Sequence, residues 1–361
     1  RFLSLVIALY GLIVISKNIE RAKLLKTHNR KLSDQNLPSL DILVAARDEE
    51  NVVSTLVERL YGLDYPKSKL NIYIIDDGSI DQTPLILKKL SQKFEQLKII
   101  NRPLNAGGGK SGALNYALQF TYGDWLLILD ADAQLKKDTL KRLFAFVEDG
   151  SWSAVQLRKS VINVSQNFLT SCQSMEMAMD AIFQYGRLSL AGVSELRGNG
   201  QLIKRDTLLE CGSFNEDTVT DDLDLSFRLL LAKSRIGILW DPPVMEEAVD
   251  NIFALFAQRQ RWAEGGLQRF FDYGDQLFTN KLNNIQRFDL IYFFLLQYAL
   301  PIVSLIDLIL SFFLYKQPIY WPISLTAFTL SGIAFWYGYC CKSEGPVSVS
   351  YTHLTLPTKV T

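Results

Sequence analysis

The sequence has little histidine, little cysteine and no net charge, and each shortage excludes a class of function. With only two histidines in 361 residues, a histidine-based triad or zinc site is close to excluded. The cysteines are Cys172, Cys211, Cys340 and Cys341. They share no metal-ligand spacing and are too few for a disulfide framework, which indicates a reducing compartment. Lys+Arg and Asp+Glu both number 38, so the composition points to no nucleic-acid partner. Acid and base chemistry therefore falls to carboxylates.

Charge is also missing from long apolar stretches near both ends of the chain. Residues 2–15 read FLSLVIALYGLIVI, and six basic side chains follow between Lys17 and Lys31. Two further apolar stretches, residues 290–315 and 319–341, are each long enough to cross about 30 Å of hydrocarbon. Trp and Tyr side chains flank the turn between these two stretches, as they do at membrane interfaces.

These stretches predict an integral membrane protein with transmembrane helices at residues 1–16, 290–315 and 319–341. The first residue is Arg, so we expect the first helix to lack its beginning. Basic residues after that helix, with Lys281 and Arg287 before the second, place the middle of the chain on the cytoplasmic side. A cleaved signal peptide at the start and buried core helices are the alternatives.

The tail has an unusual composition. Residues 349–358 read VSYTHLTLPT and resemble one reading frame of a sequencing-library adapter. We expect this stretch to be an assembly artefact, with the natural chain continuing differently from near Val347, and exclude it from the fold prediction.

Residues 38–275 alternate between short apolar runs and segments with helical spacing. The runs SLDILVAAR, LNIYIIDDGS, LKIINR and DWLLILDAD suit buried strands. Their order, βαβαβαβ, predicts an α/β domain with a mainly parallel sheet and helices on both faces. Ligands bind beyond the carboxyl ends of such strands, where Asp76, Asp77, Asp130 and Asp132 fall.

The run LLILDADAQL ends on two carboxylates one residue apart. Side-chain direction repeats every two residues in an extended chain, so Asp130 and Asp132 share one side. Such a pair can hold Mg²⁺ or Mn²⁺ together with substrate phosphates. Taken alone the motif is weak, since aspartates at strand ends are common caps.

Two glycine-containing turns add polar groups to the same edge. In IIDDGS, Asp76 and Asp77 can accept hydrogen bonds from a nucleobase or ribose, or can form an ordinary Asx turn. In NAGGGKSGALNYAL, Lys110 and free backbone N–H groups can meet a diphosphate. A merely flexible loop is the alternative there, and the spacing does not fit a Walker A motif.

Two later motifs carry charge. TVTDDLDLSFRL places Asp221 and Asp222 at a helix start, either as caps or with one of them as a general base. FAQRQRWAEGGLQRFF brings Gln258, Arg261 and Trp262 together just before the apolar stretches. A basic, aromatic interfacial helix is the alternative for that segment.

In this order, the motifs ILVAARDEE, IIDDGS, GGGKSGALNYAL, LDAD, TDD and QRQRW resemble those of the membrane-bound family 2 glycosyltransferases. That family contains the cellulose, hyaluronan, chitin and poly-N-acetylglucosamine synthases. The resemblance covers about residues 38–275. It implies a cytosolic GT-A domain, a UDP-sugar donor and a divalent metal.

The resemblance also implies roles for individual residues. The uridine pocket would be lined by Ala45, Arg47, Glu49, Asp76 and Asp77. Lys110 would lie near the diphosphate and donor sugar, and Asp130 and Asp132 would hold the metal. The catalytic base would be Asp222, in a TDD that stands where the family commonly has TED, with Asp221 beside it. The motif that closes over the diphosphate and acceptor would comprise Gln258, Arg261 and Trp262.

The acceptor is predicted from a closer resemblance. ELRGNGQLIKRDTLLECGSFNEDTVTDDLDLSFRL and RQRWAEGGLQRFFDY look most like the cyanobacterial-type diacylglycerol β-glucosyltransferases. This implies inverting transfer of glucose to a membrane lipid hydroxyl. A processive polysaccharide synthase extending a growing glycan, and an inactive sugar-nucleotide-binding regulator, are the alternatives.

Overall fold

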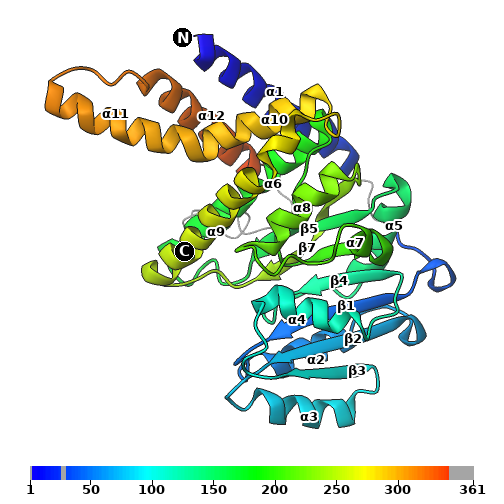
Figure 1. The fold of residues 1–361 in the computed structure, drawn as a ribbon. Helices are drawn as coiled ribbons and strands as arrows, with labels where there is room; N and C mark the ends of the chain where they lie inside the picture. Colours follow the sequence, from blue (N-terminus) through cyan, green and yellow to red (C-terminus); the bar gives the residue numbers. More distant parts are fainter. Residues whose placement is uncertain (1, 26–29, 341–361) are drawn as a thin grey trace, which may run out of the picture. The chain divides into compact units, whose positions relative to one another are not determined.

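The computed structural model describes residues 2–25 and 30–340, so the suspected artefact at 349–358 lies outside the described residues. The chain divides into two compact units (Figure 1). The sheet unit comprises Leu25–Asn163 and Glu195–Val249. The helical unit comprises Arg1–Leu24, Val164–Ser194 and Asp250–Thr361. The predicted domain at 38–275 therefore contributes to both units.

The sheet unit is built on a seven-stranded sheet in the order β3-β2-β1-β4-β6-β5-β7. The strands are β1 (Leu40–Ala46), β2 (Leu70–Asp77), β3 (Leu97–Arg102), β4 (Trp125–Leu129), β5 (Ala154–Val161), β6 (Gln201–Lys204) and β7 (Ile236–Glu246). All pairs are parallel except those of β6, which runs antiparallel to β4 and β5. The predicted α/β fold with a mainly parallel sheet is confirmed. Every residue of β4 is buried, as expected for a strand covered on both faces.

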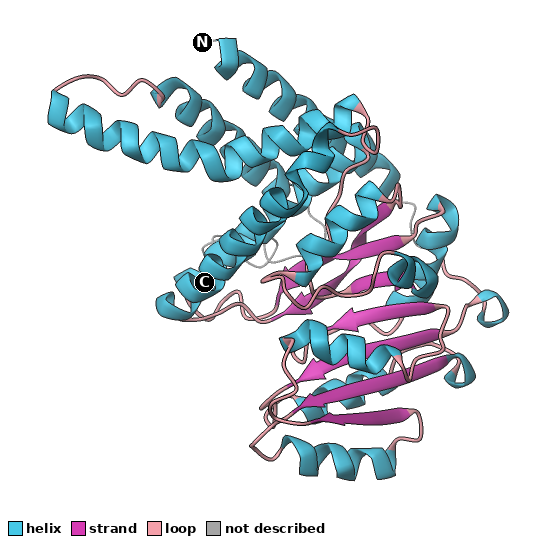
Figure 2. Cartoon of the chain, in the orientation of Figure 1, coloured by secondary structure: helices cyan, strands magenta, loops and turns pink. Residues whose placement is uncertain are grey.

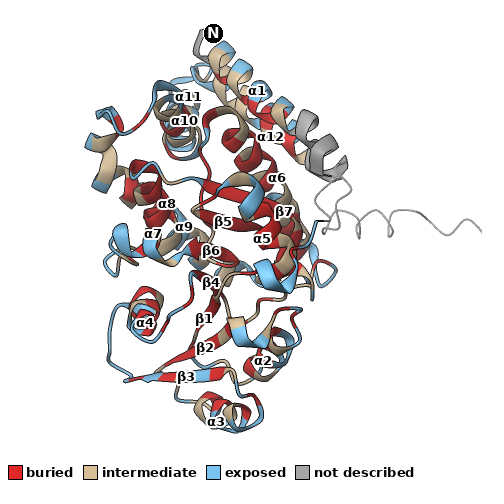
Figure 3. Ribbon diagram, turned by 90° about the vertical axis from the view of Figure 1, so that its right-hand side faces the viewer, coloured by how far each residue is buried: buried red, intermediate tan, exposed pale blue. Residues whose placement is uncertain are grey.

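Helices cover both faces of this sheet (Figures 2 and 3). They are α2 (Val53–Tyr61), α3 (Thr83–Lys93), α4 (Gly109–Leu118), α5 (Thr139–Gly150), α7 (Arg205–Glu210) and α8 (Asp221–Leu231), with 3₁₀ turns η1 (Asp34–Asn36) and η2 (Lys67–Lys69). Figure 3 shows α4, α7 and α8 on one face, with α2 and α5 on the other. The core on the first face joins Leu114 of α4 and Leu225 of α8 to Leu43 and Ile75 of the strands. The helices that carry Lys110 and Asp222 are therefore held by buried apolar contacts.

The helical unit contains α1 (Phe2–Leu25), α6 (Phe168–Ala191), α9 (Ile252–Tyr273), η3 (Gly274–Phe278), α10 (Asn284–Phe294), the π-helical turn η4 (Leu295–Ala299), α11 (Leu300–Leu314) and α12 (Trp321–Cys340). Helices α10, η4 and α11 run on as one helix, Asn284–Leu314. It begins at a capping box formed by Asn283 and Gln286, six residues before the predicted start at 290.

Within the described residues, Asn284–Leu314 is the one helix that is long and apolar enough to cross a membrane. Its most apolar 18-residue segment has a mean hydropathy of 2.1, and none of that segment is buried. The apolar part of α1, Ser4–Lys17, is shorter than a full span. Helices α1 (Phe2–Leu25) and α12 (Trp321–Cys340) overlap the predicted segments 1–16 and 319–341, but their membrane insertion stays a prediction.

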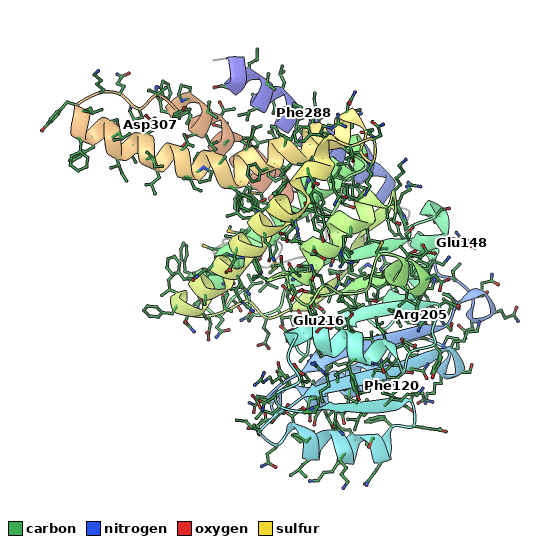
Figure 4. All side chains as sticks on the ribbon, viewed as in Figure 1. Phe120, Glu148, Arg205, Glu216, Phe288 and Asp307 are labelled. Atoms are coloured by element: carbon green, nitrogen blue, oxygen red, sulfur yellow. The ribbon has the colours of Figure 1, made fainter. Side chains whose placement is uncertain are left out.

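A polar contact joins α11 to α12. The Tyr320 N–H donates to Asp307 Oδ2 at 2.8 Å, so this carboxylate caps the turn that begins α12 (Figure 4). The hydroxyls of Ser304 and Ser324 are 2.7 Å apart on the same two helices. The one charged residue within the 290–315 stretch thus has a structural partner.

A buried ion pair ties α1, α6 and α10 together. Arg187 donates to Asp289 at 2.8 Å, and these side chains are 2% and 0% exposed. The Tyr10 hydroxyl donates to the other carboxylate oxygen at 2.7 Å, and the Arg187 guanidinium lies 3.9 Å from the Phe293 ring centroid. A Cβ on Gly186 would lie 2.0 Å from the Val14 carbonyl oxygen, so α6 and α1 pack at backbone distance. A buried charged cluster thus connects three helices of this unit.

Candidate active site

The parallel strands β2, β1 and β4 bring their carboxyl ends to one edge of the sheet. Ala46 of β1 pairs with Asp76 of β2, and Asp130 follows the last residue of β4. Ala45 is half-buried beside them, whereas Arg47 is exposed. The structure therefore brings together the strand-end aspartates predicted from the sequence.

The loops after β1 and β2 are cross-linked. The Asp48 N–H donates to Ser79 Oγ at 3.0 Å, and the Ile80 N–H donates to Asp48 Oδ1 at 2.8 Å. The Glu49 N–H donates to Thr83 Oγ1 at 2.9 Å. These contacts fix Glu49 next to the strand-end aspartates.

Asp76 and Asp77 have different partners. Asp76 Oδ1 accepts the Ser79 N–H at 3.0 Å, which is the Asx-type turn kept open as an alternative. Asp77 forms an ion pair with the buried Arg102, which also donates to the Gly107 carbonyl at 2.8 Å. Sequence analysis missed Arg102, although Asp77 and Arg102 are direct neighbours in the β2–β3 register. Asp77 therefore helps to shape the glycine loop, and its predicted contact with uridine stays a prediction.

The glycine loop adopts backbone angles that favour glycine. Gly107, Gly108 and Gly109 have φ values of +73°, +68° and +52°. The loop leads into the first turn of α4, where Lys110 Nζ lies 2.6 Å from Asp130 Oδ1. The predicted diphosphate-binding lysine thus contacts one of the predicted metal ligands.

Carboxylates crowd around Asp132. Burial raises the pKa of the Asp132 carboxyl, and the charges of Glu246 and Asp130 raise it further. Burial and the charges of Asp132 and Asp130 likewise raise the pKa of Glu49. Asp132 Oδ2 accepts the Glu247 N–H at 2.9 Å. A bound cation would relieve this repulsion, so the donor set fits a hard divalent ion.

No group of three or more His, Cys, Asp or Glu placed to bind a metal occurs among the described residues. Two protein carboxylates, Asp130 and Asp132, would leave the remaining positions to substrate phosphates and water. That division is typical of Mg²⁺, which is usually bound through one or two carboxylates.

A buried network missed by the sequence analysis supports Asp130. The Asp130 N–H donates to Asn199 Oδ1 at 3.2 Å, and Asn199 Nδ2 donates to Glu246 Oε2 at 3.0 Å. Lys159 Nζ lies 3.1 Å from the same Glu246 oxygen. Asn199 is fully buried between Gly198 and Gly200, which both have positive φ. The only sequence signal was the GNG triplet.

Asp222 lies in the first turn of α8. Burial and the neighbouring Asp221 charge raise its pKa to about 6, although Lys159 and Arg197 act in the opposite direction. Its Oδ1 accepts the Leu223 N–H at 2.8 Å. A Cβ on Gly198 would lie 3.4 Å from Asp222 Oδ2, at ordinary van der Waals contact, so the GNG turn passes directly beside this oxygen. A carboxylate with this pKa suits proton transfer near neutral pH.

The charge of Asp222 acts on Lys110, the residue predicted to lie near the diphosphate. The charges of Asp130, Asp221 and Asp222 raise the pKa of Lys110 against the opposing effect of burial. Thr220 Oγ1 and Asp221 Oδ2 are buried with no hydrogen-bond partner in the described part of the chain. Both atoms therefore have unused hydrogen-bonding capacity next to Asp222.

The raised pKa of Asp222 predicts an acid limb in the pH profile of kcat/KM, that is, a loss of activity toward low pH. A general base acts only when deprotonated, so kcat/KM is expected to fall as the pH drops below about 6. Asp221→Asn removes a charge that raises this pKa, so the limb should move to lower pH. A kcat/KM profile of both proteins between about pH 4.5 and 8 measures it. A limb that stays in place in the variant contradicts the assignment.

Gln258, Arg261 and Trp262 lie on α9 of the helical unit. Their spacing of three and four residues places them on one face of the helix. Arg259 lies 4.1 Å from the Trp262 ring centroid and forms an ion pair with Glu176 of α6 at 2.5 Å. The structure thus brings the three motif residues together, and their approach to the diphosphate stays a prediction.

The fold is of the GT-A type found in nucleotide-sugar-dependent transferases. A mannosyltransferase from Pyrobaculum calidifontis, solved with GDP-Man and Mn²⁺, matches with a TM-score of 0.63 and 18% identity over 97% of this chain and 89% of that one. Staphylococcus aureus TarS 1-349, solved with UDP-GlcNAc, matches with a TM-score of 0.51 and 16% identity over 87% and 91%. At these identities the matches establish the fold alone.

The sequence comparisons identify the family. The family model described as Glycosyl transferase family 2 matches residues 41–210. The β-monoglucosyldiacylglycerol synthase of a Nostoc species is 42% identical over 311 residues, 86% of this chain. The chain belongs to the family 2 glycosyltransferases. It spans 66% of the length of that Nostoc relative, just under two thirds.

Proposed function

We propose that the protein is an inverting, metal-dependent glucosyltransferase that moves glucose from UDP-glucose to diacylglycerol and forms a β-glucoside. The observation that carries the proposal is the arrangement at the sheet edge. Lys110 Nζ lies 2.6 Å from Asp130 Oδ1, and the charge of Asp222, whose own pKa is raised, acts on the same lysine. Identity of 42% with the Nostoc β-monoglucosyldiacylglycerol synthase supports glucose as the sugar and diacylglycerol as the acceptor.

The donor would bind along the loops after β1, β2 and β4. Its uridine would be held by Ala45, Arg47, Glu49, Asp76 and Asp77. Asp130 and Asp132 would hold Mg²⁺ or Mn²⁺, which would neutralise charge on the diphosphate. The Lys110 ammonium would act on the same charge from the first turn of α4.

The acceptor hydroxyl would lie next to Asp222. Asp222 would take the hydroxyl proton while that oxygen attacks the anomeric carbon from the face opposite UDP. The bond from carbon to the UDP oxygen breaks as the new glycosidic bond forms, so an α-linked donor gives a β-linked product. Negative charge passes to the departing UDP, where Lys110 and Arg261 would stabilise it.

Membrane attachment would give the enzyme access to its lipid acceptor. Asn284–Leu314 is the candidate span, and the segments 1–16 and 319–341 would accompany it. Basic residues beside these segments would keep the GT-A domain on the cytoplasmic side. Gln258, Arg261 and Trp262 on α9 would close over the diphosphate and the acceptor.

The proposal is tested by following labelled sugar. Membranes that contain the protein are incubated with radiolabelled UDP-glucose, Mg²⁺ and diacylglycerol, and the lipid and polymer fractions are separated. Label in one glucolipid, made by the wild type and lost in Asp222→Asn, supports the proposal. Label in insoluble polymer instead assigns a processive polysaccharide synthase, and UDP binding without any labelled product assigns an inactive regulator.

Replacing Asp132 should damage both donor binding and turnover. Asp132→Asn removes one of two proposed metal ligands, so the Mg²⁺ concentration for half-maximal activity should rise by roughly tenfold or more. Mg²⁺ titrations of activity and of UDP binding measure the change. The control is Glu95→Gln, which neutralises an exposed carboxylate outside the proposed site, and it should behave as the wild type. Unchanged metal dependence in Asp132→Asn refutes the ligand assignment.

A further inference from the structure

Asn115, five residues after Lys110 on α4, makes a two-way contact with a distant backbone segment. Its Nδ2 donates to the Phe214 carbonyl at 2.8 Å, and its Oδ1 accepts the Phe214 N–H at 3.0 Å. The same Nδ2 donates to Glu216 Oε1 at 2.7 Å. One side chain thus holds both the peptide groups of Phe214 and the carboxylate of Glu216.

Glu216 also fits against the glycine loop. Its Oε2 lies 2.3 Å from the position that a Cβ on Gly108 would take and 3.2 Å from that of Gly112. Figure 4 labels Glu216 beside the start of α4. The missing side chain of Gly108 therefore leaves the space that the carboxylate occupies.

Residues 211–216, here called the bridging segment, are also tied to α8. Arg228 of α8 donates to the Ser213 carbonyl at 2.8 Å and pairs with Asp224 at 2.6 Å. Asn215 Nδ2 donates to Asp224 Oδ1 at 3.2 Å. Asp224 is 2% exposed and lies two residues after Asp222. The bridging segment thus links α4, which carries Lys110 in its first turn, to α8, which carries Asp222 in its first turn.

We infer that Asn115 is a positioning residue that holds Asp222 at its working distance from the donor through the bridging segment. This inference rests on the proposed function, because it assigns Asn115 a role in that transfer. Asn115 touches neither donor nor acceptor in this scheme. It acts only through Phe214, Glu216 and the start of α8.

Both helices are held by buried apolar residues, so the expected kinetic effect comes from the stretch between the bridging segment and Asp222. Ala113, Leu114, Ala117 and Leu118 bury α4 against β1 and β2. Loss of Asn115 should therefore leave Lys110 and donor binding in place. The stretch from the bridging segment to Asp222 would lose a fixed contact, so the base would be displaced. Small displacements of a reacting group cost rate rather than binding.

Asn115→Asp tests the inference with nearly the same side-chain shape. An oxygen would then face the Phe214 carbonyl and the Glu216 carboxylate, and both contacts become repulsive. We expect kcat to fall roughly 10- to 100-fold while KM for UDP-glucose stays within about threefold. Glu216→Gln alone should change little, because its carbonyl still accepts from Asn115. Combined with Asn115→Asp it supplies a donor and should restore part of kcat.

The measurements use the full chain in membranes, with whichever acceptor the wild type glycosylates, so a wrong acceptor assignment does not affect this test. Wild-type kcat in Asn115→Asp, equal losses of kcat and UDP affinity, or no recovery in the double variant would each overturn the inference. If Asn115→Asp does not fold, Glu216→Ala replaces it, since the Phe214 contacts remain. A lower kcat at unchanged KM then supports the inference, and unchanged kcat overturns it.

Discussion

Asp222→Asn is expected to lower kcat by roughly 10²- to 10⁴-fold while the affinity for UDP changes by less than about threefold. The amide keeps the shape of the carboxylate and the acceptor for the Leu223 N–H, but it cannot take a proton. The residues proposed to hold the uridine and the metal lie on other elements, so the proposed donor site should stay complete. Initial rates with saturating UDP-glucose and UDP titration by calorimetry measure the two quantities.

The same substitution should not destabilise the fold. Burial and Asp221 disfavour the charged form of Asp222, as its raised pKa shows, and asparagine removes that unfavourable charge. The melting temperature is therefore expected to be unchanged or higher. Asp206→Asn is the matched control, because Asp206 is an exposed aspartate in the first turn of α7. Full turnover in Asp222→Asn, or an equal loss in Asp206→Asn, would refute the base assignment.

Asp289→Ala is expected to destabilise the helical unit by about 3–5 kcal/mol. The change removes the carboxylate that pairs with the 2%-exposed Arg187 guanidinium. It also takes the acceptor from the Tyr10 hydroxyl, which connects α1 to α10. Thermal or denaturant unfolding in detergent, followed by tryptophan fluorescence, measures the shift.

Two comparisons separate the ion pair from general effects of substitution. Asp272→Ala removes an exposed aspartate from α9 and should change stability by less than about 0.5 kcal/mol. Replacing both partners, as Arg187→Met with Asp289→Leu, should cost less than Asp289→Ala, because the buried cation is removed together with its carboxylate. A double variant less stable than Asp289→Ala would contradict this account of the pair.

Most of the sheet could be predicted because buried parallel strands are continuous apolar runs. The run WLLIL of β4 is apolar throughout, as is typical of a buried strand. Strands β5, β6 and β7 were not predicted. QLIK of β6 has only four residues and a polar end, so it carries no strand pattern, and its antiparallel pairing makes the sheet mixed. The start of the long helix at Asn284 followed from a capping box that hydropathy does not register.

Residues of the candidate site could be predicted where they stand at the end of an apolar strand or within a local helical motif. Asp130 and Asp132 are read directly from the end of an apolar run. Lys159, Asn199 and Glu246 reach the site through the pairing of β5, β6 and β7, whose register is not local in sequence. The pairing of Asp77 with Arg102 has the same origin, because it depends on how β2 lies against β3. Residues that become partners only through the long-range register of the strands could therefore not be predicted from the sequence.

The proposed reaction displaces UDP from the anomeric carbon in a single step, with Asp222 as the base. The anomeric configuration of the product tests this mechanism most directly. The glucolipid made from UDP-glucose and diacylglycerol is purified, and its configuration is read from the coupling of the anomeric proton by NMR. One displacement at an α-linked donor predicts a β-glucoside. An α-glucoside would contradict the account, because retention requires a mechanism that one general base does not provide.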